Sequence, residues 1–490
     1  MRDRDFGIRA RLKRGAGIML TAVLLFCTAG CMAGESSYAA KSAEDKNPIK
    51  ITLWTYYGGQ QLECFLSLVQ EFNDTVGREK GIHVEPTSQG SLEDLESAVW
   101  AAVDKRVGSA EVPDLFPVYP DTAKELDARG ILKDMAPFLS EAEKKEYVDR
   151  YMEDGVLSAK NELKIFPIAK ATELLILNRT DWDRFAEETG ADIEKLSTIE
   201  GVTELAEEYY EWTDRKTATP DDGKALFGRD SLANYCMVGA AQLGTGILTP
   251  DEEGRAEIHF DRKVMRKLWD NYYVPFINGY FTASGRFRSD DMKMGTILAF
   301  VGSSASVTFA SGTVTRSDNT SYPVRLEIRK APVFAEGEQY YVEQGAGMAV
   351  SVSNEEKEKA AVEFLKWFTK TENNLRFSLA TSYLPVKIAA NNPELLSGSG
   401  ASDIIRSALK TAMTTVNENK MYSTAPMKNS AKLRTYLATS LIEQSEMDRE
   451  SVEILVKQGM RRKEAAAQYD TDKNFDRWYE KTKKELEEMR

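Results

Sequence analysis

The sequence is poor in the side chains that bind metals and carry out nucleophilic catalysis. Its 490 residues include only two histidines, His83 and His259, and four cysteines. A zinc site or a disulfide framework needs more of these residues than the chain supplies. We therefore expect no metal site and no cofactor, and we expect both histidines to have surface or structural roles.

Motifs of several common enzyme classes are also missing. The chain has no G-x-x-x-x-G-K-[ST] loop and no H-E-x-x-H pair, and the stretch GSSAS at 302–306 lacks the closing glycine of a G-x-S-x-G elbow. A pair of carboxylates could still serve a glycosidase, because the chain has 77 acidic residues. No spacing singles out one such pair.

Positive charge is scarce relative to negative charge. The 64 Lys and Arg residues face 77 Asp and Glu residues, which gives a net charge of −13. Such a field repels phosphate backbones, so we expect no nucleic-acid partner. Hydrophobic residues make up 42% of the chain, as in soluble globular proteins. The length exceeds what one hydrophobic core organises and predicts at least two packed units.

The first thirty residues have the composition of an export signal. Six basic residues lie within 1–14, and an uncharged stretch follows from 15 to 34. The alternative is an uncleaved transmembrane anchor, since twenty uncharged residues could span a bilayer. Both interpretations place the rest of the chain outside the cytoplasmic membrane.

Small residues at 29 and 30 precede Cys31, and this stretch resembles the lipobox of bacterial lipoproteins. The resemblance implies that the signal peptide 1–30 is removed and that Cys31 carries the lipid that anchors the chain to the cell membrane. Residues 31–47 lack an apolar pattern and predict a flexible tether. Without residues 1–30 the chain carries 58 basic and 75 acidic residues, a net charge of −17.

Strand and helix patterns alternate three times after residue 48. The predicted strands are 49–53, 82–84 and 114–119, and the predicted helices are 62–72, 91–103 and 121–129. This alternation predicts parallel βαβ units, in which ligands bind beyond the carboxyl ends of the strands. The loops after the first and third strands contain Trp54, Tyr56, Tyr57 and Tyr119.

The rest of the chain continues this mixed pattern. Further strands are predicted at 165–167, 174–177, 295–301, 325–334 and 345–352. A capping box at 353–356 predicts the start of another helix. Beyond about residue 400 the pattern is mostly helical, and the charged run 473–490 predicts a solvated helix.

Several motifs together resemble the extracellular solute-binding proteins of ABC importers, in particular the sugar-binding family that includes the maltose-binding protein. The motifs are PDLF at 113–116, ARGILKDM at 128–135, FPIA at 166–169, LLILNR at 174–179, GAGMAVS at 345–351, AAVEFLKWF at 360–368 and YLPV at 383–386. The resemblance covers most of residues 49–390. After residue 400 it is only compositional.

The resemblance implies an α/β fold of the two-lobe, type II periplasmic-binding-protein kind, with a hinge between the lobes. The first lobe would comprise residues 48–170 and 343–384, and the second lobe residues 171–342 and 385–490. We expect a membrane-tethered, monomeric receptor without enzymatic activity. It would capture an oligosaccharide or a related polar solute in the interlobe cleft and deliver it to the permease subunits of an ABC importer.

Two other functions stay open at this point. An exported hydrolase acting on glycosides would share the secretion signal and the acidic composition. A surface lipoprotein could instead bind a polymer or a partner protein without transport.

Sugar recognition needs flat aromatic faces and planar polar side chains. By position in the matched pattern, the expected ligand-binding residues are Trp54, Tyr56, Tyr57, Tyr119, Asp121, Lys170, Glu173, Ser303, Ser304 and Glu343. Trp54 could instead close the core, and Lys170 and Glu173 could form an ion pair between lobes. Ser304 stands where several sugar binders have a stacking Trp, so Tyr235 or Tyr422 would have to supply that face.

Two further residue groups could form a crosslink or a metal site. Cys64 and Cys236 remain after the signal, and we expect buried free thiols, although they could pair. Adjacent tyrosines occur at 209–210, 272–273 and 340–341, and related binding proteins hold ferric iron with tyrosinates. Because neighbouring side chains point apart in strands and helices, we expect these tyrosines to pack in the core.

Overall fold

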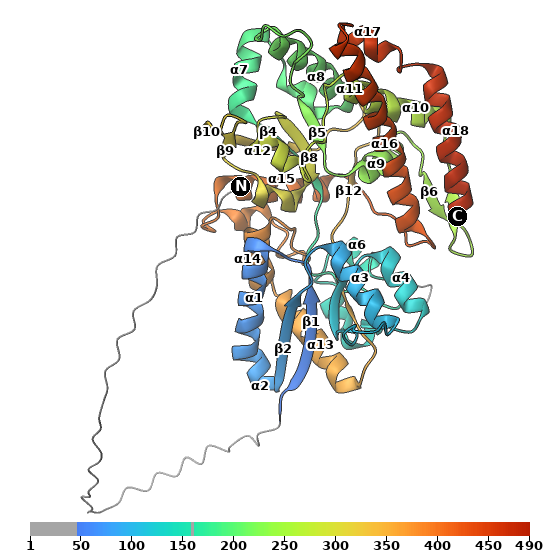
Figure 1. The fold of residues 1–490 in the computed structure, drawn as a ribbon. Coiled ribbons are helices and arrows are strands. Elements are labelled where there is room, and N and C mark those ends of the chain that lie inside the picture. The colour runs from blue at the N-terminus through green and yellow to red at the C-terminus, as the bar shows by residue number, and fades with distance from the viewer. Residues whose placement is uncertain (1–46, 158–160) are drawn as a thin grey trace, which may run out of the picture. The chain divides into compact units, whose positions relative to one another are not determined.

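The computed structural model describes residues 47–157 and 161–490. Residues 47–490 form one compact unit (Figure 1). The expected signal peptide, the lipidation site Cys31 and all but the last residue of the expected tether lie outside the described residues. Among the helices that are described, none is long and apolar enough to cross a membrane.

The first sheet has the strand order β13-β3-β1-β2. Strand β1 (Ile49–Thr55) pairs in parallel with β2 (Ile82–Ser88) and β3 (Leu115–Val118). Strand β13 (Gly347–Val350) returns from much later in the chain and pairs antiparallel with β3. The three parallel strands confirm the predicted βαβ units. We call this sheet with its covering helices the first lobe.

Helices pack on both faces of the first sheet, and its buried side chains belong to two cores, one on each face. Leu53 faces a core shared with α1 (Gly59–Phe72), α13 (Glu355–Phe368) and α14 (Thr371–Thr381). Its neighbour Trp54 faces a second core. That core is shared with α3 (Leu92–Val103) and α4 (Pro120–Ala128). The remaining short helices are η1 (Asn73–Gly77), α2 (Arg78–Lys80), η2 (Ala136–Phe138), α5 (Glu141–Lys144) and α6 (Asp149–Glu153).

The second sheet has the strand order β11-β4-β8-β5. Strand β4 (Glu173–Asn178) pairs antiparallel with β11 (Leu326–Lys330) and β8 (Ala299–Ser303). Strand β5 (Phe227–Arg229) lies parallel to β8. We call this sheet with its covering helices the second lobe. The second lobe also contains two short two-stranded sheets, formed by β6 (Leu248–Pro250) with β7 (Ala256–Ile258) and by β9 (Thr313–Thr315) with β10 (Ser321–Pro323).

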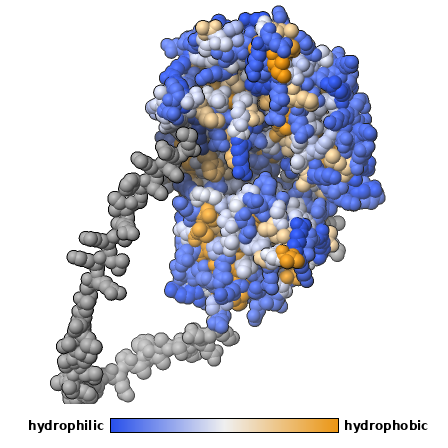
Figure 2. All heavy atoms as spheres, in the orientation of Figure 1, coloured by the Kyte–Doolittle hydropathy of each residue, from blue (hydrophilic) through white to orange (hydrophobic). Residues whose placement is uncertain are grey.

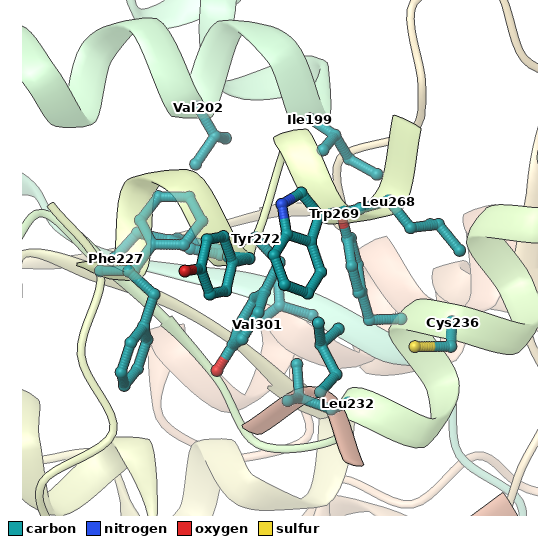
Figure 3. Packing of buried hydrophobic residues seen from close by; sticks show 14 of the residues in the cluster. Ile199, Val202, Phe227, Leu232, Cys236, Leu268, Trp269, Tyr272 and Val301 are labelled. Atoms are coloured by element: carbon teal, nitrogen blue, oxygen red, sulfur yellow. The ribbon is translucent and has the colours of Figure 1, made fainter. Parts of the chain in front are cut away.

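The second sheet is also covered on both faces. Leu175 and Leu177 of β4 face the larger core, which Figure 3 shows around Trp269 and Tyr272. Its helices are α7 (Arg179–Thr189), η3 (Ile193–Ser197), α8 (Ile199–Asp214), α9 (Leu232–Gln242), α10 (Arg262–Asp270), α11 (Tyr273–Ile277), α16 (Ser430–Lys457), α17 (Arg462–Ala467) and α18 (Asp472–Met489). The opposite face carries α12 (Arg288–Lys293), η4 (Ser304–Phe309), η5 (Pro393–Leu396) and α15 (Asp403–Glu418). The visible surface in Figure 2 is mostly hydrophilic, with small separate hydrophobic patches.

Three local predictions were wrong. Residues 165–167 form no strand, because only Phe166 bridges to Met348. Helix α13 has no capping box; its N-cap is Asn354, whose side chain accepts a hydrogen bond from the Lys357 N–H. The charged C-terminal run is not fully solvated, since α18 buries an apolar stripe that includes Trp478.

Helix α16 is a structural part of the second lobe. Leu433, Leu437 and Leu441 recur every four residues along one face and are fully buried in the larger core. Helices α9, α11, α17 and α18 pack around α16 (Figure 1). The C-terminal helices therefore complete the core of this lobe.

We expect Leu437→Ala to lower the free energy of unfolding by about 2 to 5 kcal/mol, because it leaves a cavity in the packed core. Met447→Ala on the same helix serves as the matched control, since Met447 is 55% exposed, and it should change stability by less than about 0.5 kcal/mol. Urea unfolding followed by circular dichroism measures both. Equal effects of the two substitutions would contradict the buried position of Leu437.

Candidate functional site

Three crossing segments meet between the lobes. The Ala171 N–H donates to the Gln344 carbonyl at 2.7 Å, and the Lys170 N–H donates to the Leu384 carbonyl at 3.0 Å. Gly345 has φ 114°, and a Cβ there would lie 3.1 Å from the Lys170 Cα. Only glycine allows both this backbone conformation and this close approach. The segments are therefore held side by side by their backbones.

A buried ion network surrounds this junction. The Lys170 ammonium lies 2.6 Å from Asp154 Oδ2 and 3.3 Å from Glu343 Oε1. The Arg150 Nε lies 2.9 Å from Glu343 Oε2. Glu343 thus joins one crossing segment to α6 of the first lobe. Lys170 therefore pairs with Asp154 and Glu343, and not with Glu173 as the ion-pair alternative expected.

Burial raises the pKa of Glu343 from its ordinary value of 4.5 to about 7, with Lys170 opposing and Asp154 adding to the rise. The Asp154 carboxyl has a lowered pKa, because Lys170 and hydrogen bonds to its carboxylate outweigh its own burial. Each of the two carboxyl groups affects the pKa of the other. A proton on Glu343 therefore removes the repulsion between them.

The junction forms the floor of a cleft whose empty space, about 700 Å³, includes space open to the solvent. Its lining includes Tyr119, Pro120, Asp121, Tyr151, Asp154, Gly155, Ile165, Pro167 and Lys170 from the first lobe. The rest of the lining consists of Val342, Glu343, Gln344, Gly345 and Gly347 near the crossing, and Asn234, Ser423, Thr424, Ser430 and Arg434. Both lobes thus contribute polar groups to one cavity, as a solute site requires.

Four of the expected ligand-binding residues line this cleft: Tyr119, Asp121, Lys170 and Glu343. Tyr119 and Asp121 follow β3, at the carboxyl end of a parallel strand. Tyr119 is the N-cap of α4, and Asp121 lies in the first turn of that helix. The Asp121 side chain accepts a hydrogen bond from the Thr122 N–H at 3.0 Å.

Tyr56 and Tyr57 lie in a tyrosine cluster with Tyr119 and Tyr383. Tyr57 is buried, and its ring centroid lies 5.0 Å from that of Tyr56 and 6.2 Å from that of Tyr383. Tyr56 is half-buried, so the two neighbours do face different surroundings. Burial raises the pKa of all four hydroxyls, which keeps them protonated. The cluster offers neutral rings and hydroxyls beside the cleft.

The other expected residues lie elsewhere. Trp54 packs between the first sheet and α3, and it lines a separate recess with Asp114. Glu173 and Tyr235 line a smaller pocket of about 330 Å³, which shares Asn234 with the cleft. The Tyr235 hydroxyl donates to the Leu268 carbonyl inside the core. Its ring therefore does not supply the aromatic face that a Trp provides in several sugar binders. Tyr422 pairs with Val342 through β12 (Tyr340–Val342) and β14 (Lys420–Tyr422), next to the cleft-lining Ser423.

Ser303 and Ser304 belong to the junction between β4 and β8. Ser303 pairs with Glu173 in the sheet, and the Ser304 N–H donates to the Thr172 carbonyl at 2.7 Å. Ser304 is fully buried. These contacts stabilise the start of the second lobe.

Sequence reasoning missed several lining residues, above all Asn234, Ser430 and Arg434. The Asn234 Nδ2 donates to Glu173 Oε1 at 2.8 Å and to Gln344 Oε1 at 2.9 Å, so α9 is tied to two crossing segments. Ser430 and Arg434 begin α16, beyond the part of the chain that carried the resemblance. The regular leucine spacing in α16 was the only local signal for this helix.

Metal and disulfide chemistry finds little support in this structure. Among the described residues, no group of three or more His, Cys, Asp or Glu side chains could hold a metal ion. Cys64 and Cys236 are free thiols, and only Cys236 is fully buried. Of the paired tyrosines, those at 209–210 and 272–273 pack in the larger core, as expected.

Comparison with protein families gives one match that covers most of the chain. Residues 67–401 match the model of a family described as bacterial extracellular solute-binding protein. No curated protein matches the chain in sequence.

Solved structures share the arrangement of both lobes. The cyclic α-maltosyl-1,6-maltose-binding protein of Arthrobacter globiformis has a TM-score of 0.61 and 15% identity, over 90% of this chain and 99% of its own. UgpB of Mycobacterium tuberculosis in complex with glycerophosphocholine has a TM-score of 0.65 and 15% identity, over 91% and 98%. The maltotriose-bound MalE domain of Bdellovibrio bacteriovorus has a TM-score of 0.58 and 14% identity, over 89% and 100%. These similarities confirm the predicted two-lobe α/β fold.

The raised pKa of Glu343 predicts a specific pH dependence of stability. Between about pH 4.5 and 7 the folded chain holds a proton that the unfolded chain releases, so the free energy of unfolding falls as pH rises. Glu343→Gln removes this contribution. The free energy of unfolding of the variant minus that of the parent protein should therefore be larger at pH 8 than at pH 5, by roughly 1 to 3 kcal/mol.

Urea unfolding of both proteins at the two pH values measures this difference. Glu443→Gln removes an exposed carboxylate and is the matched control. An identical pH dependence of the parent protein and Glu343→Gln would contradict the raised pKa.

Proposed function

The chain belongs to the bacterial extracellular solute-binding protein family, and we propose that it captures a carbohydrate in its interlobe cleft and delivers it to the permease of an ABC importer. We propose further that it acts as a monomer anchored by lipid at Cys31. Residue Cys31 follows the lipobox-like stretch described above.

One observation carries the choice of a carbohydrate. Neutral tyrosine rings, including Tyr119, lie beside a cleft whose lining also includes hydroxyl, amide and charged side chains. Rings of this kind stack on the C–H faces of sugars, and planar polar groups bind hydroxyls. The saccharide-binding proteins of Arthrobacter and Bdellovibrio share the fold and support the same solute class.

The geometry of the carboxylates argues against a glycoside hydrolase. Retaining and inverting glycosidases hold two carboxyl groups about 5 to 9.5 Å apart, with the sugar between them. Here Asp154 and Glu343 both contact the Lys170 ammonium, at 2.6 and 3.3 Å. Such a network is suited to joining the lobes.

A panel of neutral and acidic oligosaccharides should contain ligands that raise the melting temperature of the full chain. Ligand at 100 times its Kd stabilises the folded state by about 2.7 kcal/mol. Chromatography of the same samples should show no cleavage product. Product formed with turnover would overturn the receptor function, and mass spectrometry of solute that co-purifies with the protein identifies the ligand directly.

Tyr119→Ala should weaken binding of the identified saccharide roughly tenfold, since it removes the ring beside the cleft. Tyr119→Phe keeps the ring and should retain most of the affinity. Tyr436→Ala on α16 is the control, because Tyr436 does not line the cleft. Isothermal titration calorimetry measures all three, and full affinity of Tyr119→Ala would contradict the placement of the sugar ring.

A further inference from the structure

The first turn of α16 opens into the cleft and carries uncompensated positive charge. This helix is 28 residues long, and its N-cap, Asn429, makes no side-chain capping bond. The Asn429 amide instead donates to the Met489 carbonyl at 3.0 Å. The first turn also contains no acidic residue. Neither the N-cap side chain nor an acidic residue in the first turn of α16 therefore offsets the positive end of its helix dipole.

Two buried polar groups within the first five residues of α16 lack partners as well. Ser430 is 1% exposed and lines the cleft, and its hydroxyl makes no hydrogen bond within the described chain. Arg434 lines the cleft one turn later, on the same face of the helix. Its Nε is buried and is likewise without a hydrogen-bond partner among residues 47–157 and 161–490. A buried donor without an acceptor is costly, which indicates that a ligand supplies the acceptor.

The other charged groups of the cleft do not satisfy Arg434. Lys170 is paired with Asp154 and Glu343 on the floor. Tyr119 and Tyr422 lie near enough to Arg434 to interact with its charge, and burial raises the pKa of both hydroxyls, which keeps them neutral. Of the two cations that line the cleft, Arg434 is thus the one without a carboxylate partner in the described part of the chain.

We infer that the solute is an acidic saccharide whose carboxylate or phosphate binds at the first turn of α16. The Arg434 guanidinium and the Ser430 hydroxyl donate to its oxygens, and the helix dipole adds to the attraction. Tyr119 faces the same space from the first lobe, where it contacts the uncharged part of the ring. This inference rests on the proposed function and narrows its substrate class.

The test uses isothermal titration calorimetry of the full chain with galacturonate trimer, glucose 1-phosphate, maltotriose and inorganic phosphate. At least one of the two acidic saccharides should bind about tenfold or more tightly than neutral maltotriose. The preference should shrink as ionic strength rises, because salt screens charge interactions. Comparing the uronate with the sugar phosphate separates the two sources of negative charge.

Arg434→Gln should weaken the bound acidic saccharide about ten- to a hundredfold and leave a neutral saccharide almost unaffected. Ser430→Ala should weaken the acidic saccharide about two- to tenfold. Lys432→Gln is the matched control, since it removes the same charge from the same turn at an exposed position. It should leave both affinities unchanged. Arg434 is half-buried, so the variant should keep its fold, which a thermal melt verifies.

The possible failures are distinguishable. If maltotriose binds as tightly as the acidic saccharides and Arg434→Gln changes neither, the acidic class is wrong and the receptor function stands. If Arg434→Gln and Asp121→Asn each weaken the binding of acidic and neutral saccharides equally, Arg434 pairs with Asp121 when the lobes close. The inference would then be wrong. If only inorganic phosphate binds, and does so through Arg434, the anion site stands without a saccharide. If nothing binds, both proposals fall.

Discussion

The rest of the structure depends on how three stretches of backbone pass through one junction between the lobes. Lys170 and Ala171 are paired on one side with Gln344 and on the other with Leu384. This arrangement is possible because Gly345 has no side chain where the backbones approach. Segments 173 and 214 residues apart in sequence therefore keep one fixed relation. The strands and helices that continue from these segments position the walls of the cleft.

The buried ions at the junction link solute capture to the relation between the lobes. Burying a charge is costly unless it is paired, so Lys170 holds Asp154 and Glu343 together. Asn234 of α9 donates hydrogen bonds to Glu173 and to Gln344, the sequence neighbour of Glu343, so the second lobe is held at the same junction. A solute changes the equilibrium between open and closed forms only through contacts that differ between them. Groups that reach the cleft from opposite lobes, such as Tyr119 and Arg434, are suited to make such contacts.

Local sequence patterns predicted most of the fold but only part of the site. Alternating apolar residues identified β1, and β3 was also predicted as a strand. Tyr119 and Asp121, which follow β3, line the cleft. The same reasoning could not tell that Trp54 faces α3, because the exposed Lys50 and Thr52 on the same side of β1 mark that side as polar. Arg434 carries no local signal, since it reaches the cleft only through the packing of α16.

The acidity of the whole chain and the positive turn of α16 act over different distances. Acidic residues outnumber basic ones by 13 in the complete sequence, which opposes attraction of anions from a distance. At physiological salt, however, exposed charges more than about 8 Å away are largely screened. Inside the cleft Arg434 interacts with Tyr119 and Tyr422, which burial keeps neutral, and the other lining cation, Lys170, is already paired. Recognition of an anion there would depend on short-range donors held by α16, so an acidic protein can still select an acidic solute.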